Sequence, residues 1–134
     1  MKKIDLIKFY KQHNLDKDDV YKDDRGFIII KRSGIEKIQY QNNIKVAFET
    51  IKCELDNVVF KAVSMRYDSN MQEFIPLIET FGSASKNNCR NHFLAEMAEK
   101  RSLARVIIKT MQFTNVKGED EIKNQPSKSL NSFK

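Results

Sequence analysis

The chain has 134 residues, the length of a single domain with room for one hydrophobic core. Its composition, with 40% hydrophobic and 31% charged residues, is typical of a soluble globular protein, and no apolar run reaches the ~20 residues of a membrane-spanning helix. Lysines and an aspartate precede any apolar stretch at the N-terminus, which argues against a secretory signal. We therefore expect a cytoplasmic protein with no membrane partner. The net charge of +6 fits either an anionic partner or a solvated surface.

The first third of the chain predicts two helices around a short strand. Residues 3–13 place apolar side chains at helical spacing, and the acidic run over 16–24 is typical of a solvated turn and helix cap. A calcium loop would need a glycine and a closing glutamate that are missing. Phe27–Ile30 is a continuous apolar run that predicts a buried strand. Ser33, with a glutamate three residues later, predicts a capping box that begins the next helix.

Three β-like segments follow, over residues 44–55, 58–67 and 72–82. The alternation of apolar residues in the first segment shifts phase near its middle, which predicts a bulge or a bend. Polar turn residues separate the segments. Pro76 has no amide donor, so the third segment is predicted to be an edge strand or to have a bulge there.

The longest predicted helix spans residues 89–112 and carries one apolar stripe. After it the chain becomes polar and has too little apolar surface to fold by itself. We therefore predict one domain over residues 1–113 and a polar, disordered tail over 114–134. The predicted fold is α+β: an antiparallel β-meander in a β-β-β-α core, with an N-terminal helix and a long C-terminal helix packed on the sheet.

Signals of catalysis are sparse in this sequence. It has no phosphate-binding glycine loop, and two histidines do not make a recognisable triad. The two cysteines, Cys53 and Cys89, are interpreted as reduced thiols, although one disulfide stays an alternative. The cysteine spacing and the distant His13 and His92 argue against zinc. We expect no cofactor, no metal and no catalytic residue, and hence a protein that is not an enzyme.

The excess positive charge is concentrated in residues 86–109, where six basic and two acidic side chains give a net charge of +4. Arg101, Arg105 and Lys109 recur every four residues and form one stripe on the last helix, with Lys100 beside it. An acidic residue one turn earlier is placed to pair with Lys100, but none is so placed for the two arginines. Stacked like charges at this spacing favour an anionic partner.

A second basic group, Lys31 and Arg32 with Lys37, lies where the first predicted strand enters its helix. Tyr40, Tyr67 and Phe81 are candidates for stacking on nucleobases, with a position in the core as the favoured alternative.

The last strand and helix share a pattern with a known family. The strand ends in the small residues Gly82-Ser83-Ala84-Ser85, and the helix contains Ala98-Glu99-Lys100-Arg101-Ser102-Leu103-Ala104-Arg105. Residues 79–113 in this respect resemble the core of Erf-type phage single-strand annealing proteins, a superfamily similar to the annealing domain of the eukaryotic recombination mediator. With the upstream elements, the resemblance extends over about residues 25–113. The chain departs from the family at Met111-Gln112-Phe113, where a glycine usually closes the helix.

The resemblance implies ATP-independent annealing of complementary strands by rings or filaments that hold single-stranded DNA in a basic groove. By motif position, Lys100 and Arg101 are the groove contacts, and the Lys31-Arg32 corner is the opposite wall. Such a protein is expected in the cytoplasm of a bacterial host and to come from a phage or prophage. The predicted DNA-binding residues are Lys100, Arg101, Arg105, Lys31, Arg32, Lys86, Arg90 and Lys109.

Two other functions stay open at this stage. One is an interaction protein of a mobile element that uses the same fold to bind and inhibit a host or defence protein. The other is a metal-dependent nuclease, for which acidic residues on or between the strands would gather the metal. These are Glu54, Asp56, Asp68, Glu73 and Glu79.

Overall fold

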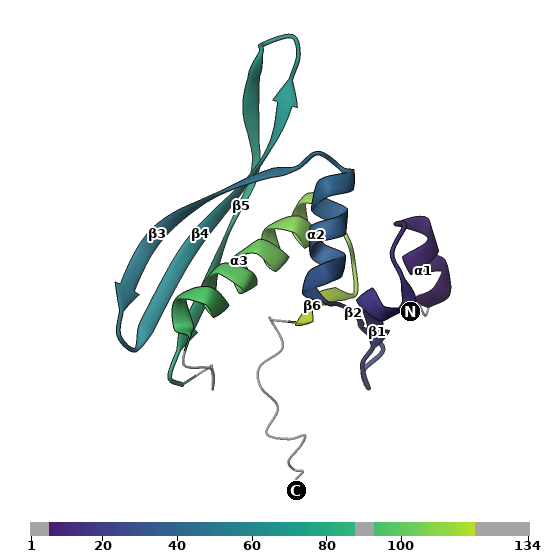
Figure 1. The fold of residues 1–134 in the computed structure, drawn as a ribbon, viewed down its shortest axis with the longest axis horizontal. Helices are drawn as coiled ribbons and strands as arrows, with labels where there is room; N and C mark the ends of the chain where they lie inside the picture. The colour runs from purple at the N-terminus through teal and green to yellow at the C-terminus, as the bar shows by residue number, and fades with distance from the viewer. Residues whose placement is uncertain (1–5, 88–92, 120–134) are drawn as a thin grey trace, which may run out of the picture.

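A computed structural model describes residues 6–87 and 93–119, which form three α-helices, one 3-10 helix and two three-stranded sheets (Figure 1). This arrangement confirms the predicted α+β class, with an antiparallel meander and a long C-terminal helix packed on it. The elements in chain order are α1 Leu6–Gln12, η1 Lys17–Asp19, β1 Val20–Lys22, β2 Ile28–Ile30, α2 Arg32–Gln41, β3 Lys45–Glu54, β4 Asn57–Asp68, β5 Glu73–Ser85, α3 Leu94–Thr110 and β6 Val116–Gly118.

The meander consists of β3, β4 and β5 in sequence order, so β3 and β5 are its edges. Both predicted irregularities are present. The β3–β4 register shifts between Thr50 and Lys52, where the apolar alternation changes phase. The β4–β5 register shifts between Ser64 and Met65, and Met65 then pairs with Pro76. A proline on an edge strand beside a bulge does not interrupt the ladder, because no partner requires its missing amide hydrogen.

Helix α3 lies against one face of the meander, and small residues allow the close approach (Figure 1). Ala98 and Ser102 of α3 are fully buried. A Cβ atom added at Gly82 of β5 would come within 2.6 Å of the Ala98 carbonyl oxygen and closer still to the backbone nitrogen of Ser102. The Thr80 hydroxyl donates a hydrogen bond to the Ser102 carbonyl at 3.1 Å. Only glycine at position 82 is therefore compatible with this helix–sheet distance.

The second sheet has the strand order β1-β2-β6. Its central strand β2 is fully buried, which explains the continuous isoleucine run. Strand β6 pairs with β2 in parallel, and Val116 and Gly118 are buried. Ordered secondary structure therefore continues beyond residue 113, where the predicted domain ends. Neither β1 nor β6 is predicted from the sequence, because each has only three residues and lies among polar neighbours.

The acidic run before β1 forms the predicted turn and cap, but the predicted capping box at Ser33 is wrong. Asp16 donates its backbone N–H to Oδ2 of Asp19 at 2.8 Å and so caps η1. Helix α2 already begins at Arg32, with Lys31 as its N-cap residue. The Ser33 hydroxyl donates instead to Oδ1 of Asp19 at 2.6 Å, because Asp19 is buried against the first turn of α2.

Helix α3 ends at Thr110, two residues before the predicted end at residue 112. Among the described residues it begins at Leu94. Its C-terminal end is closed by Gln112, which adopts a left-handed conformation with φ of 58°. Phe113 then donates its backbone N–H to the carbonyl of Ile108 at 3.2 Å. Gln112 thus has the left-handed conformation that glycine most often adopts after the end of a helix. Of the helices that the structure describes, none is long and apolar enough to cross a membrane.

Candidate nucleic-acid interface

Arg101 and Arg105 of α3 both bind the backbone of the edge strand β5. Arg101 donates from Nη1 to the Ser83 carbonyl at 2.9 Å, and Arg105 donates from Nη1 to the Phe81 carbonyl at 3.1 Å. Four residues of helix rise about 6 Å, which matches the ~6.6 Å spanned by two residues of a strand. The four-residue spacing of the arginines therefore has a structural explanation and by itself no longer indicates an anionic partner.

The two arginines differ in exposure. Arg101 is 8% exposed, so its side chain is almost entirely covered by protein. Arg105 is exposed to solvent while keeping its carbonyl contact. Of these two predicted DNA contacts, Arg105 has the accessibility that a phosphate contact requires, whereas Arg101 supports the α3–β5 junction.

Lys100 points to a different side of α3, toward α2. Together with Arg32, Ile35, Leu103 and Ala104 it lines a narrow depression that is too small to hold a water molecule. Lys100 makes no ion pair with any residue that the structure describes. Arg32 donates from Nε to Oε2 of Glu36 at 3.0 Å, in an exposed pair one helical turn apart. The structure thus brings together Arg32 and Lys100, which were predicted to belong to opposite walls of a groove, and separates Lys100 from Arg101.

An ionic network attaches the first part of α2, which contains Arg32, to η1. Lys37 Nζ binds Oδ2 of Asp19 at 2.7 Å and Oδ2 of Asp16 at 3.0 Å. Burial alone would raise the pKa of Asp19, but hydrogen bonds from Lys37, Ser33 and the Asp16 backbone outweigh it and hold the pKa below its ordinary value. In this network the charge of Lys37 is paired with the carboxylates of Asp16 and Asp19.

The other predicted DNA contacts lie further apart. Lys31 Nζ stands over the Tyr21 ring, 5.9 Å from its centroid, next to Arg32 in the chain. Lys109 is exposed in the last turn of α3, where the helix dipole favours a cation. Lys86 is exposed in the turn after β5. Arg90 lies outside the described residues.

The favoured interpretation of three aromatic residues as core was wrong. Tyr40 is 86% exposed, Tyr67 56% and Phe81 49%. Tyr67 packs edge-on against Phe74 across the β4–β5 ladder, with ring centroids 5.4 Å apart. All three rings are therefore accessible from solvent, as stacking on a base requires.

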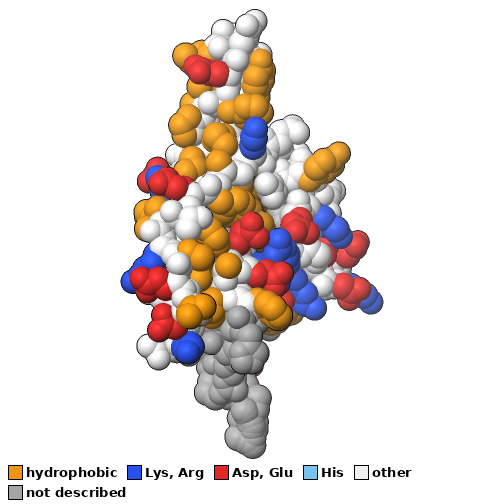
Figure 2. Space-filling view, turned by 60° about the vertical axis from the view of Figure 1, so that its left-hand side comes forward, with side chains coloured by type: hydrophobic (Ala, Val, Ile, Leu, Met, Phe, Trp, Pro, Cys, Tyr) orange, Lys and Arg blue, Asp and Glu red, His pale blue; other side chains and the backbone are white. Residues whose placement is uncertain are grey.

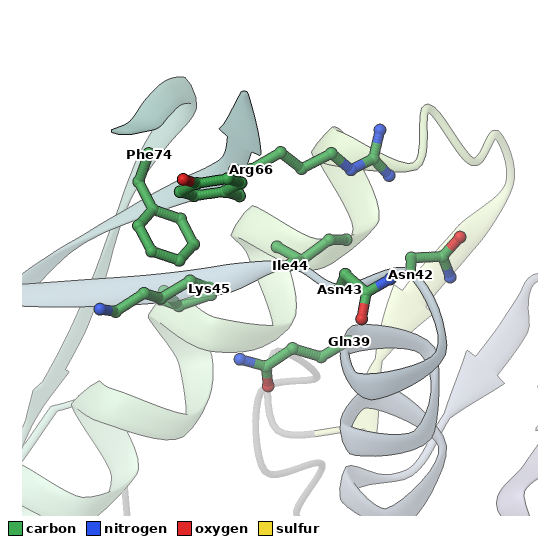
Figure 3. Close-up of a pocket in the computed structure, with 9 residues that line it drawn as sticks. Gln39, Asn42, Asn43, Ile44, Lys45, Arg66 and Phe74 are labelled. Atoms are coloured by element: carbon green, nitrogen blue, oxygen red, sulfur yellow. The ribbon is translucent and has the colours of Figure 1, made fainter. Parts of the chain in front are cut away.

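An open pocket of about 810 Å³, which the sequence did not predict, lies between the C-terminal end of α2 and the outer part of the β4–β5 hairpin (Figure 3). It arises because β3 begins opposite Met65, so β4 and β5 continue past it as a two-stranded hairpin. The Asn42-Asn43 pair after the predicted helix was a signal for a chain reversal at this place, but the register of β3 cannot be read from the sequence. The chemically distinctive lining residues are Gln39, Asn43, Lys45, Arg66, Tyr67 and Phe74.

The part of the chain that the structure describes contains no candidate metal site. No three His, Cys, Asp or Glu side chains are grouped there so as to hold a metal ion. The acidic residues of the meander are instead distributed along it, and two of them form exposed pairs. Lys61 binds Oε1 of Glu49 at 3.1 Å, and Lys52 lies 3.7 Å from Oε1 of Glu54.

Comparisons with known proteins do not assign the chain to a family. No protein-family model, no curated protein and no solved structure matches it.

Proposed function

We propose that this protein binds single-stranded DNA and anneals complementary strands without ATP. The observation that carries the proposal is the meeting of Arg32 and Lys100 in one depression between α2 and α3. These residues come from two segments far apart in the sequence, and two cations at one place suit successive phosphates of one strand.

The local energetics favour exchange of protein contacts for phosphate contacts. The Arg32–Glu36 pair is exposed, and such pairs contribute only about 0–1 kcal/mol, so a phosphate can replace the carboxylate at little cost. Arginine binds phosphate through two parallel N–H donors, and lysine acts as a compact charge. Lys31 lies next to Arg32 in the chain, and Arg105 and Lys109 are exposed elsewhere on α3. Annealing needs only neutralised backbones with free base edges, so no catalytic residue is required.

Assembly into rings or filaments, in the cytoplasm of a bacterial host, completes the proposal. Each copy would add a few cations to a continuous path for the strand. The outer edge of β3 pairs with no other strand of the described chain, and its backbone groups are of the kind that mediate association between chains. Native mass measurement with and without single-stranded DNA tests this point, and a strict monomer under both conditions would contradict it.

The DNA-binding test uses fluorescence anisotropy with a labelled oligothymidylate at several salt concentrations. The double variant Arg32→Ala, Lys100→Ala should bind more weakly, and its slope of log affinity against log salt should be shallower by about 1.4, or about 0.7 for each phosphate that is no longer neutralised. The matched control is Lys11→Ala, Lys52→Ala, which removes two exposed lysines from α1 and β3. Equal reductions of affinity in the two double variants would show that only net charge matters and would refute the proposed interface.

Annealing is measured separately, as the rate at which two complementary oligonucleotides pair in the absence of ATP and metal ions. The wild-type protein should accelerate pairing, and the Arg32→Ala, Lys100→Ala variant should not. Strand cleavage that depends on magnesium would favour a nuclease instead.

A second candidate function, binding of another protein, is favoured by the uncovered face of the meander. Helix α3 covers one face, while hydrophobic side chains remain exposed on the sheet, among them Phe74 at 43%, Leu77 at 43% and Phe81 at 49%. Figure 2 shows hydrophobic side chains along the sheet with charged ones between them. Salt separates the two functions, because apolar association withstands salt concentrations that release DNA.

A further inference from the structure

The pocket at the C-terminal end of α2 is basic, and none of the described residues that line it is acidic. Lys45 and Arg66 reach it from β3 and β4, and both are exposed. Across residues 6–87 and 93–119, neither residue has an ion-pair partner. Two cations without carboxylate partners beside a pocket favour an anionic ligand, and the planar guanidinium suits phosphate.

Two aromatic rings adjoin these cations. Tyr67 and Phe74 are cross-strand partners in the β4–β5 ladder. Lys45 Nζ lies over the Phe74 ring, 4.7 Å from its centroid, so that ring already holds a cation. Tyr67, which is 56% exposed, is therefore the ring available for stacking on a planar ligand.

Side-chain amides form the helix side of the pocket (Figure 3). Asn42 donates from Nδ2 to the Ile38 carbonyl at 2.8 Å, which holds that amide against the helix end. The side-chain amides of Gln39 and Asn43 have no hydrogen-bond partner within the described chain. Each amide offers one acceptor and two donor hydrogens, the groups that pair with the edge of a nucleobase.

We propose that this pocket binds one nucleotide, with its phosphate at Arg66, its base stacked on Tyr67, and the edge of that base at Gln39 and Asn43. The Lys45 side chain points away from the Arg66 guanidinium and adds positive charge at the other side of the pocket (Figure 3). The pocket volume of about 810 Å³ lies within the ~300–1,000 Å³ range of small-molecule sites. The inference deepens the proposed function and rests on it when the nucleotide belongs to a bound strand. A strand held at Arg32 and Lys100 through its backbone would then also be held through one unstacked base.

The same chemistry can come from a nucleotide within a strand or from a free mononucleotide, and two measurements separate these sources. The first compares the affinity of the full chain for oligothymidylate with its affinity for an oligonucleotide of equal length that carries abasic sugars. The second titrates thymidine monophosphate into isotope-labelled protein and follows the amide resonances of Gln39 and Asn43.

Wild-type protein should prefer oligothymidylate to the abasic strand by roughly 10-fold or more, the effect expected of one stacked base. Tyr67→Leu removes the aromatic plane but keeps a bulky strand residue, and Gln39→Ala removes an amide from a helix without disturbing its backbone; each should reduce the preference. Phe48→Leu is the matched control, because this exposed ring lies on β3 but does not line the pocket.

The outcomes distinguish this inference from the proposed function. Equal binding of both oligonucleotides by wild type and all variants, with no response to the mononucleotide, would overturn the nucleotide site and leave DNA binding intact. Absence of binding to either oligonucleotide, together with Tyr67-dependent mononucleotide shifts, would refute the proposed function and support a site for free nucleotides. Absence of all binding would overturn both. Thermal unfolding of each variant confirms that the compared proteins are folded.

Discussion

Arg101 donates from Nη1 to the carbonyl oxygen of Ser83 at 2.9 Å, and its side chain is buried between α3 and β5. A buried guanidinium is costly unless its donors are satisfied, and the outward carbonyls of an edge strand are acceptors that no neighbouring strand uses. The contact therefore stabilises two otherwise unfavourable groups together. It also places Arg101 in the framework that holds α3, rather than on the surface that meets solvent.

This placement predicts that Arg101 affects stability more than DNA binding. Arg101→Met keeps an unbranched stem but removes the donors, so the free energy of unfolding should fall by about 1–3 kcal/mol. Arg105→Met, at the exposed contact with Phe81, should cost less. Urea unfolding measures both. A stable Arg101→Met protein without affinity for oligothymidylate would show instead that Arg101 contacts DNA directly.

Gly82→Ala should disrupt the helix–sheet junction. The added methyl group meets the backbone of Ala98 and Ser102, which cannot move without displacing α3, so the loss of stability should reach the upper part of the ~1–3 kcal/mol range of overpacked cores, or exceed it. Thermal unfolding followed by circular dichroism measures the effect.

Gly26→Ala is the informative comparison for that experiment. Nothing lies within 4 Å of a Cβ at Gly26, but its φ of 89° disfavours any side chain. Its cost should therefore be limited to that of the backbone conformation, about 1–2 kcal/mol. A larger loss of stability at Gly26 than at Gly82 would contradict the close approach of α3 to β5.

The Asp19–Lys37 network predicts a specific acid sensitivity. Because the pKa of Asp19 is lower in the folded protein than its ordinary value of 3.8, its stabilising contribution is complete above that value and is lost as pH falls through the folded pKa. Asp19→Asn should therefore be less stable than wild type near neutral pH, and the difference should shrink in acid. Chemical unfolding at a series of pH values measures it. A difference that is constant with pH would mean that Asp19 contributes through shape and not through charge.

The elements predicted from the sequence are those whose signal is local. The phase shift near Thr50 and the proline at position 76 each produce a bulge, because alternation and the missing amide act on the strand that contains them. The meander and α3 follow from periodicity over many residues. Strands β1 and β6 have three residues each, too few for a period, and they exist because Ile28–Ile30 between them needs partners on both sides.

The candidate site was less predictable, because its geometry depends on contacts between distant segments. Neighbours in the sequence, Lys100 and Arg101, face α2 and β5 respectively. The four-residue spacing of the arginines predicts a row of contacts for an anion. That spacing contains no information on the β5 carbonyls that the two arginines bind. To predict the pocket at Lys45 and Arg66, one must know where the pairing of β3 with β4 ends. Only the register of the two strands provides this information.

The parallel pairing of β6 with β2 has a consequence for the order of folding. The paired residues Ile28 and Val116 are separated by α2, the whole meander and α3, so closing this loop carries a large entropic cost until those elements have condensed. Strand β6 is then expected to pair with β2 late in folding, after the elements between them have formed. Amide hydrogens of β6 should accordingly exchange with solvent through local opening, while the isoleucine amides of β2 exchange only on global unfolding.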